Sequence, residues 1–282
     1  MVAGSSLGRR NVTEDFRAVV VSASADIANA LIMNWRSRNW DVCGTYRQES
    51  SIVDLQRENG VTLYQCDLEI ASEIDNVSER IVETFARWDV LVLAAGTQVP
   101  VGHFSAVDID DWCMSIQTNF LGQVRFVHRL MTHRNLETDR SPTVIFFAGA
   151  GTNNAPTNYS AYVVSKIASI KMTEVLAAEF PDTRFVIVGP GWVKTKIHQA
   201  TLSAEHAAGD NYERTVQKLE SNDCTSMNDV VDCCNWLIGS DRDAVTGRNF
   251  SVVFDDWGHE TLLEELVADN DMYKLRRFGN KN

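Results

Sequence analysis

The sequence contains no apolar run long enough to span a membrane and no CxxC pair. Its six cysteines are not accompanied by a histidine cluster, so we expect reduced thiols and no metal site. An excess of basic charge is also missing. The formal net charge is -12 at pH 7, whereas a nucleic-acid-binding face must be basic. These absences predict a cytoplasmic globular protein that has neither a nucleic-acid partner nor a membrane partner.

The chain is interpreted as one folded domain between two terminal segments. Residues 1–16, MVAGSSLGRRNVTEDF, lack the apolar core of a secretory signal and are expected to form a flexible tail. Short apolar runs then alternate with helical patterns such as residues 26–37, and strands are expected at 18–22, 41–46, 61–65, 90–94, 143–147, 184–188 and 250–254. This alternation predicts a single doubly wound Rossmann-type α/β domain over residues 17–255, with a parallel sheet of about seven strands. Residues 256–282 are a C-terminal extension.

The turn after the first expected strand lacks the glycines that usually let a backbone approach a pyrophosphate. It reads VSASADIANA, and the candidate cofactor contacts in it are Ser22, Ser24, Asp26 and Ile27. Small residues still permit a tight turn, and the N–H groups of the following helix remain. Asp26 can instead simply cap that helix. The segment is therefore compatible with a cofactor turn or with an ordinary strand–turn–helix connection.

The end of the second expected strand bears on the choice of cofactor. Tyr46 and Arg47 lie there, and no carboxylate does. An acidic residue at this place binds the ribose of NAD, whereas an arginine accommodates the 2′-phosphate of NADP. Arg47 can also be an ordinary surface arginine. Asp67 and Leu68 follow the third strand, where Asp67 either contacts an adenine or begins a turn. We expect NADP(H) in preference to NAD(H).

The residues with the clearest chemical meaning are Tyr162 and Lys166. They are four positions apart on a helix expected to begin near Ser160, so they share one face. A nearby ammonium group stabilises a phenolate and lowers the pKa of the phenol, which allows proton exchange with a substrate oxygen. Tyr-x-x-x-Lys also arises by chance as a surface pair. Its place after a strand and a Gly/Asn/Pro loop favours a catalytic role.

Several segments together resemble the short-chain dehydrogenase/reductase family over about Ala18 to Phe254. The resemblance implies that Tyr162 is the acid/base, that Lys166 activates it and binds the nicotinamide ribose, and that Asn119 supports a proton-relay water. It implies further cofactor contacts in LAAG and GPGWVKT, namely Ala94, Ala95, Gly96, Pro190, Gly191, Val193 and Thr195. It also implies a homodimer or homotetramer built through the helices that contain Asn119 and Tyr162.

One departure from the family pattern concerns the catalytic serine, whose position is taken by Gly149. Loss of one such donor costs about 3–4 kcal/mol of transition-state stabilisation. Three accounts remain open. Thr152, Asn153 or a backbone N–H replaces the serine, or the substrate brings its own polar group and needs the room. Alternatively, the chain binds a dinucleotide or a metabolite without catalysing a reaction.

The substrate is suggested by the segment after Thr195. Residues near 196–225 resemble the family's substrate lid, and Lys194, Lys196 and His198 place positive charge at its start. That charge indicates a phosphate-bearing substrate, or else a solvated helix face. The C-terminal tail loosely resembles relatives in surface-polysaccharide and nucleotide-sugar pathways. We therefore expect an NADP(H)-dependent enzyme that interconverts a carbonyl and a hydroxyl on a small, polar, sugar or nucleotide-sugar substrate. The alternative is a catalytically weak or inactive dinucleotide-binding regulatory or sensor protein.

Overall fold

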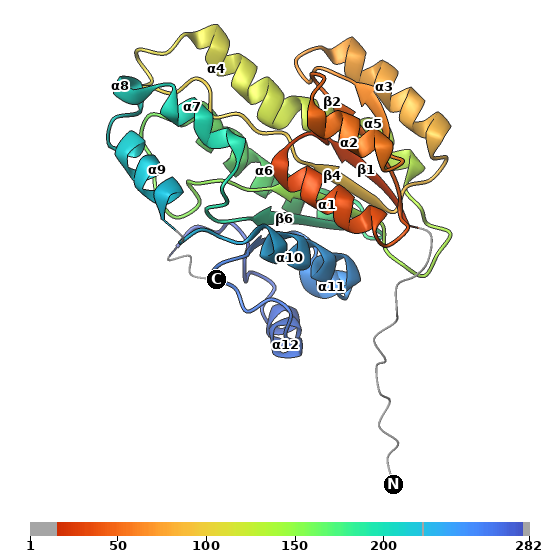
Figure 1. The fold of residues 1–282 in the computed structure, drawn as a ribbon. Coiled ribbons are helices and arrows are strands. Elements are labelled where there is room, and N and C mark those ends of the chain that lie inside the picture. The colour runs from red at the N-terminus through yellow and green to blue at the C-terminus, as the bar shows by residue number, and fades with distance from the viewer. Residues whose placement is uncertain (1–15, 222, 279–282) are drawn as a thin grey trace.

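The computed structural model describes residues 16–221 and 223–278 (Figure 1). The strands are β1 (Arg17–Val21), β2 (Asp41–Tyr46), β3 (Thr62–Gln65), β4 (Val90–Leu93), β5 (Thr143–Phe147), β6 (Arg184–Gly189) and β7 (Arg248–Ser251). The longer helices are α1 (Asp26–Arg36), α2 (Ser51–Glu58), α3 (Ala71–Thr84), α4 (Ile109–Ile116), α5 (Gly122–Leu130), α6 (Ser160–Glu179), α9 (Asp210–Glu220), α10 (Met227–Gly239) and α12 (Glu260–Ala268). Shorter ones are η1 (Gln117–Leu121), η2 (Met131–His133), η3 (Lys196–His198), α7 (Gln199–Leu202), α8 (Glu205–Ala208) and α11 (Arg242–Val245).

The seven strands form one parallel sheet in the order β3-β2-β1-β4-β5-β6-β7. The predicted doubly wound fold is thus confirmed. The order reverses between β1 and β4, and in such sheets ligands bind beyond the carboxyl ends of the strands at this switch point. The last strand was predicted at 250–254, but it lies at Arg248–Ser251. The prediction extended too far because Val253 and Phe254 are apolar, although both are exposed.

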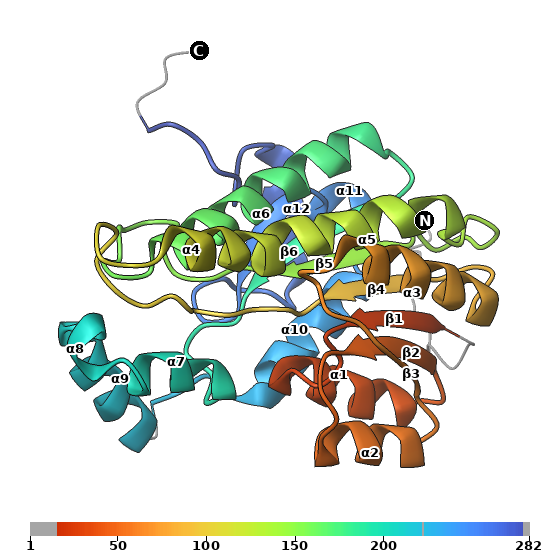
Figure 2. The same cartoon turned by 90° about the horizontal axis from the view of Figure 1, so that it is seen from above.

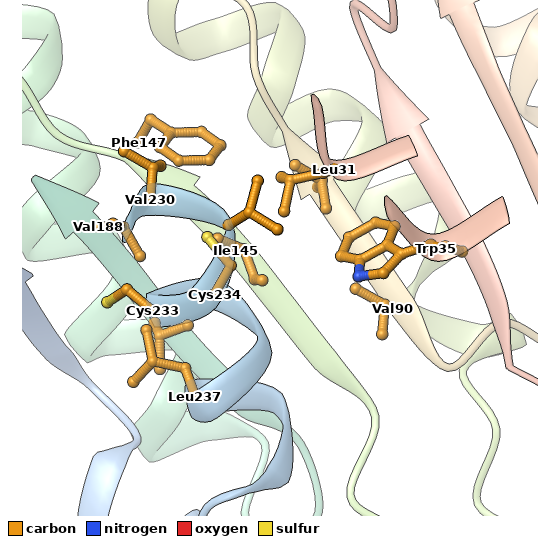
Figure 3. Packing of buried hydrophobic residues seen from close by; sticks show 14 of the residues in the cluster. Leu31, Trp35, Val90, Ile145, Phe147, Val188, Val230, Cys233, Cys234 and Leu237 are labelled. Carbon is orange, nitrogen blue, oxygen red and sulfur yellow. The ribbon is translucent and has the colours of Figure 1, made fainter. Parts of the chain in front are cut away.

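Helices cover both faces of the sheet (Figure 2). On one face, α1 and α10 pack against each other and against the strands. Figure 3 shows the side chains that meet there: Leu31, Trp35, Val90, Ile145, Phe147, Val188, Val230, Cys233, Cys234 and Leu237. On the other face, α3, α5 and α6 bury the second apolar cluster. Burial on both faces explains why the central strands read as continuous apolar runs.

The N-terminal boundary needs one correction. Residues 1–15 of the expected tail lie outside the described residues, but Phe16, its last residue, is buried. The Phe16 ring stacks on Trp40, with the ring centroids 4.2 Å apart. The packed domain therefore includes Phe16, because its ring fills the apolar layer between β1 and the end of α1.

The C-terminal extension packs against the domain through Arg248 of β7. This guanidinium is buried and donates hydrogen bonds to the carbonyl oxygens of Ala244, Leu266, Asp269 and Met272. Three of these carbonyls lie at or beyond the C-terminal end of α12, where a helix leaves its last carbonyls unpaired. Arg248 therefore fastens the extension to the sheet.

Within residues 16–221 and 223–278, no helix is both long and apolar enough to cross a bilayer. The same residues contain no group of three or more His, Cys, Asp or Glu side chains that could hold a metal ion.

Candidate active site

The candidate catalytic residues lie at the carboxyl edge of the sheet, close to the switch point. Lys166, on α6, is buried, and its Nζ donates a hydrogen bond to the carbonyl oxygen of Phe147 at the end of β5, at 2.9 Å. The same Nζ is 5.8 Å from the centroid of the Tyr162 ring. It also lies 3.9 Å from the point where a Cβ on Gly96 would be. The structure therefore brings Tyr162, Lys166 and the turn after β4 together.

Tyr162 packs directly on the backbone at Gly149. A Cβ built at Gly149 would lie 2.7 Å from Cζ and 2.8 Å from Cε1 of the Tyr162 ring. Atoms cannot approach this closely without a shift, so the ring takes the space in which a side chain at 149 would begin. Of the three accounts of the missing serine, the one that needs room for a substrate group at Gly149 finds no room in this conformation.

Burial sets the protonation states of the pair. It raises the pKa of Tyr162 to about 12 and lowers the pKa of Lys166 to about 8. We expected the ammonium to lower the phenol pKa, and this structure shows the reverse. The reason is that loss of water around the phenol dominates, while Lys166 is turned towards the Phe147 carbonyl. At neutral pH, Tyr162 is consequently a neutral phenol.

Asn119 lies in η1, a π-helical turn between α4 and α5, and is buried. Its side chain accepts a hydrogen bond from the Thr97 N–H at 2.8 Å and donates to the Thr97 carbonyl at 2.9 Å. The backbone carbonyl of Asn119 accepts a hydrogen bond from Nε2 of Gln123 at 2.7 Å. π-Helical turns are frequent at functional sites. Asn119 therefore fixes the loop after β4.

The two expected substitutes for the serine lie in the loop before α6. Thr152 is half-buried and Asn153 is exposed. Neither side chain makes a hydrogen bond with the part of the chain that the structure describes. Gly151, which precedes them, has φ +110°, and a Cβ there would meet Val163 at 2.5 Å. The backbone of this loop is thus held close to α6, while Thr152 and Asn153 remain available to a ligand.

The turn between β1 and α1 keeps the conformation of a glycine turn without a glycine. Ser22 has φ +64°, and its N–H is bonded to Oγ1 of Thr45 at 3.0 Å. The first turn of α1 has no side-chain cap, so its leading N–H groups remain free for an anion. The carboxylate of Asp26, however, lies at this helix end and accepts the N–H of Lys196 at 2.7 Å. Ile27 is half-buried beside it.

Arg47 and Tyr46 have different surroundings at the end of β2. Arg47 is exposed, and its guanidinium makes no ion pair with any described residue. The Tyr46 hydroxyl instead donates to Glu49 at 2.6 Å and accepts from Arg57 at 2.8 Å. Arg47 is therefore free to bind a phosphate, whereas the Tyr46 hydroxyl already has two partners.

Asp67 and Leu68 follow β3. One carboxylate oxygen of Asp67 accepts the N–H of Glu69 at 3.0 Å, which is a local turn contact. Leu68 is buried, and its carbonyl accepts from Gln117 at 3.0 Å. Ala94 pairs with β1 through its N–H, and the Ala95 carbonyl accepts from Gln123 at 3.2 Å. These contacts fix the backbone after β3 and after β4 at the carboxyl edge of the sheet.

The segment after β6 is arranged around two aromatic rings. Pro190 is followed by Gly191, whose φ is +73° and where a Cβ would meet Thr225 and Val253 at 2.5 Å. Trp192 stacks on His198 with centroids 4.3 Å apart, and the carbonyl of Val193 is bonded to His198. Thr195 precedes η3.

The positive charge expected at the start of the lid is smaller than the sequence indicated. His198 is buried, and burial lowers its pKa, so it is neutral at pH 7. The ammonium of Lys196 donates to the Ser24 carbonyl at 2.6 Å. Only Lys194 is exposed and has no polar partner among the described residues. The charges of Lys194, Lys196 and His198 therefore do not favour a phosphate group on the substrate.

The residues fit a nicotinamide dinucleotide at both ends of the crevice. Arg47 makes no ion pair with the described residues at the adenosine end, and Lys166 lies beside Gly96 at the other end. Between them, the uncapped N-terminus of α1 suits a pyrophosphate, except that the Asp26 carboxylate lies against it. These residues therefore suit a dinucleotide, apart from the negative charge of Asp26.

Sequence reasoning missed the contacts between the expected lid segment and the rest of the domain. The Tyr159 hydroxyl bonds to Thr201 of α7 at 2.8 Å, and Thr201 donates to Gln98 at 3.1 Å. Asn158 donates to the carbonyl of Ala208 at 3.2 Å. Figure 2 shows α7, α8 and α9 beyond the arrowheads of the strands. No local signal in the sequence marks these pairs, since their members are more than 40 residues apart.

Comparison with known proteins shows the family of the chain. Residues 21–254 match the family model described as enoyl-(acyl carrier protein) reductase. The chain belongs to the short-chain dehydrogenase/reductase family and is an oxidoreductase of that type.

Individual relatives are distant. The sulfoacetaldehyde reductase 2 of Chromohalobacter salexigens is 22% identical over 215 residues, 74% of this chain and 85% of that protein. The putative ketoacyl reductase of Streptomyces coelicolor is 24% identical over 197 residues, 66% of this chain and 74% of that protein. Among solved structures, a single-site variant of the actinorhodin polyketide ketoreductase with NADPH has a TM-score of 0.73 at 22% identity, covering 85% of this chain and 96% of that one. The ligand-free aldohexose dehydrogenase of Thermoplasma acidophilum has a TM-score of 0.70 at 20% identity, covering 85% and 93%.

Proposed function

We propose that the protein is an NADP(H)-dependent oxidoreductase that interconverts a carbonyl and a hydroxyl on a small polar substrate. The observation that carries this proposal is the placement of Tyr162 and Lys166 on α6, beside Gly96 and the end of β5. Bound in the crevice, the cofactor would supply or accept the hydride. A sugar or sugar derivative remains the proposed substrate, and one structural relative is an aldohexose dehydrogenase.

Tyr162 would act as the proton donor to the substrate oxygen. Since its pKa is raised to about 12, the phenol is protonated at pH 7 and ready to give a proton in the reducing direction. Lys166 has a pKa of about 8 and is mostly charged at that pH, so it would stabilise the phenolate that results. Asn119 would hold the loop after β4 and, through its carbonyl, a water that returns the proton.

The serine's role would fall to the loop before α6. Thr152, Asn153 and the backbone around Gly151 lie next to α6 and have free hydrogen-bonding groups among the described residues. A substitute donor is needed for fast turnover, since one such hydrogen bond is worth about 3–4 kcal/mol.

The experiment follows NADPH oxidation by purified wild type with simple ketones, keto sugars and nucleotide-linked sugars. We expect turnover of at least one substrate and a fall of about 10²–10⁴-fold in Tyr162→Phe, the usual contribution of a general acid. Tyr64→Phe is the matched control, because the Tyr64 hydroxyl bonds to Thr84 on α3, away from the site. Equal activity of wild type and Tyr162→Phe would show the mechanism to be wrong.

A second function, a dinucleotide-binding sensor without catalysis, is favoured by one observation. The Tyr162 ring covers Gly149, and its phenol is difficult to ionise. Tight NADPH binding in a titration, combined with no oxidation of NADPH by any carbonyl in the panel, would favour the sensor.

A further inference from the structure

The connection between β6 and the lid crosses the crevice at the switch point. Asp26 begins α1, which follows β1, and Gly96 lies in the turn after β4, the strand beside β1. Lys196 contacts the first of these two places through its N–H to Asp26 and its Nζ to the Ser24 carbonyl, at 2.7 and 2.6 Å. Ile197 covers the second, with Cδ1 3.4 Å from the position of a Cβ on Gly96. Two consecutive residues thus bridge the place where a dinucleotide would lie.

Taking the proposed function as its basis, we propose that Asp26 and Lys196 form a latch that closes the cofactor crevice of the ligand-free protein. A dinucleotide binds by displacing the Asp26 carboxylate from Lys196. The latch joins residues 170 positions apart in the chain, so it fixes the lid to the first βα unit.

Charge explains why the latch opposes the ligand. The uncapped N-terminus of α1 carries a partial positive charge that attracts one anion. Asp26, in the first turn, already provides a carboxylate there. A pyrophosphate brought to the same helix end meets a group of like charge, and two such groups at close range repel each other. The Asp26 carboxylate, which accepts the N–H of Lys196, therefore opposes the approach of the ligand to this helix end through its charge.

The partners of Lys196 explain why the latch can open. Its ammonium is bonded to a neutral carbonyl oxygen of Ser24 in an exposed position. A phosphate oxygen is a stronger acceptor for this ammonium, because it carries a negative charge and the Ser24 carbonyl is neutral. Once a pyrophosphate is present, the Lys196 ammonium forms a stronger hydrogen bond with a phosphate oxygen than with the Ser24 carbonyl. The closed form then belongs to the free protein and the open form to the complex.

Hydrogen exchange and cofactor titration test the two halves of the proposal in the full chain. In Asp26→Ala without ligand, the backbone N–H of Lys196 loses its acceptor, so the peptide that contains it should exchange faster than in wild type. NADPH should bind this variant at least about tenfold more tightly, because the competing charge is gone. Asp26→Asn keeps an oxygen acceptor but no charge. It should therefore bind NADPH more tightly than wild type while it exchanges nearly as slowly.

The matched control is Asp41→Ala. Asp41 begins β2, at the amino end of the strands and hence at the opposite edge of the sheet. This variant loses the same charge and should change neither readout. Equal exchange at Lys196 in wild type and Asp26→Ala would overturn the latch. Equal NADPH affinity in the two proteins, or in Asp26→Ala and Asp41→Ala, would overturn the displacement. Absence of NADPH binding in every variant would refute the displacement and the proposed function together, while faster exchange in Asp26→Ala would still support the latch alone.

Discussion

The ring of Tyr162 lies against Gly149, at the position where the first atom of a side chain would stand. The residue expected to transfer the proton and the residue expected to be its serine partner are therefore not independent. The glycine lets the ring move in against the backbone after β5. A serine in the same place would keep the ring out.

Substitution of Gly149 should consequently fail to restore a family-like site. We expect Gly149→Ser and Gly149→Ala each to lower the free energy of unfolding by about 1–3 kcal/mol, the usual cost of overpacking, because the Tyr162 ring must shift. Neither should raise kcat. Thermal denaturation and steady-state kinetics measure both effects. Gly239→Ala is the control, since a Cβ there meets no atom within 4 Å. A Gly149→Ser variant about tenfold faster than Gly149→Ala would show that the hydroxyl finds a catalytic position after all.

Lys166 should make stability depend on pH in a specific window. Its pKa is about 8 when buried in the folded protein and 10.5 ordinarily. Between these values the unfolded chain holds more protons than the folded one, so the free energy of unfolding rises with pH. From about pH 7 to 10, the free energy of unfolding of wild type should rise by about 2 kcal/mol relative to that of Lys166→Met. Chemical denaturation at several pH values measures this.

Lys194→Met serves as the control for that series. Lys194 is exposed and has no polar partner among the described residues. The free energy of unfolding of Lys194→Met should therefore change with pH in the same way as that of wild type. If the free energies of unfolding of wild type and Lys166→Met differed by the same amount at every pH, Lys166 would keep an ordinary pKa in the folded protein.

Arg47 should set the preference between the two dinucleotides. It is exposed at the end of β2 and makes no ion pair with any described residue. A 2′-phosphate would give it a charge-assisted partner. Arg47→Ala should weaken NADPH binding by about tenfold or more and leave NADH binding unchanged, as measured by fluorescence titration. Arg38→Ala is a suitable control, because Arg38 follows α1 and so lies towards the opposite edge of the sheet. Equal losses for the two cofactors would argue against a 2′-phosphate contact.

The fold was readable from the sequence because each central strand is buried on both faces. Runs such as VLVL in β4 and TVIFF in β5 contain no solvent-facing position, so they stand out against the helices between them. The exception is informative. β7 begins at Arg248, whose buried guanidinium is satisfied by carbonyls that include those of the C-terminal extension. A charged residue inside a strand gives no such signal, and the exposed Phe254 gives a misleading one.

The site was readable only in part. The spacing of Tyr162 and Lys166 identified a shared helix face, but not the direction of the pKa shift at Tyr162. That direction depends on how much water is lost around the phenol and on where the Lys166 ammonium is held. The contact between Asp26 and Lys196 was also out of reach, because it joins two distant segments through a backbone N–H. Contacts of this kind are decided by the packing of whole elements and carry no local pattern.

Exposed apolar side chains occur on α4, η1 and α6, where Met114 is 44%, Leu121 48% and Val164 50% exposed. α4 and α6 lie side by side, so these side chains belong to adjacent elements. Apolar surface of this kind is characteristic of an interface. We expect the protein to form a homodimer or homotetramer through these helices, and Val164→Asp to shift it towards smaller species, because a buried, unpaired carboxylate opposes association.

Light scattering coupled to gel filtration at micromolar concentration measures this shift. Leu55→Asp is the control: Leu55 is also 44% exposed and apolar, but it lies on α2. Figure 2 shows α2 on the other side of the sheet from α4 and α6. Loss of assembly in Val164→Asp with an unchanged Leu55→Asp would place the contact on α6, because the two variants add the same charge to similar side chains. A wild type that is monomeric at this concentration, or equal effects of the two variants, would mean that the exposed face of α6 does not join the subunits.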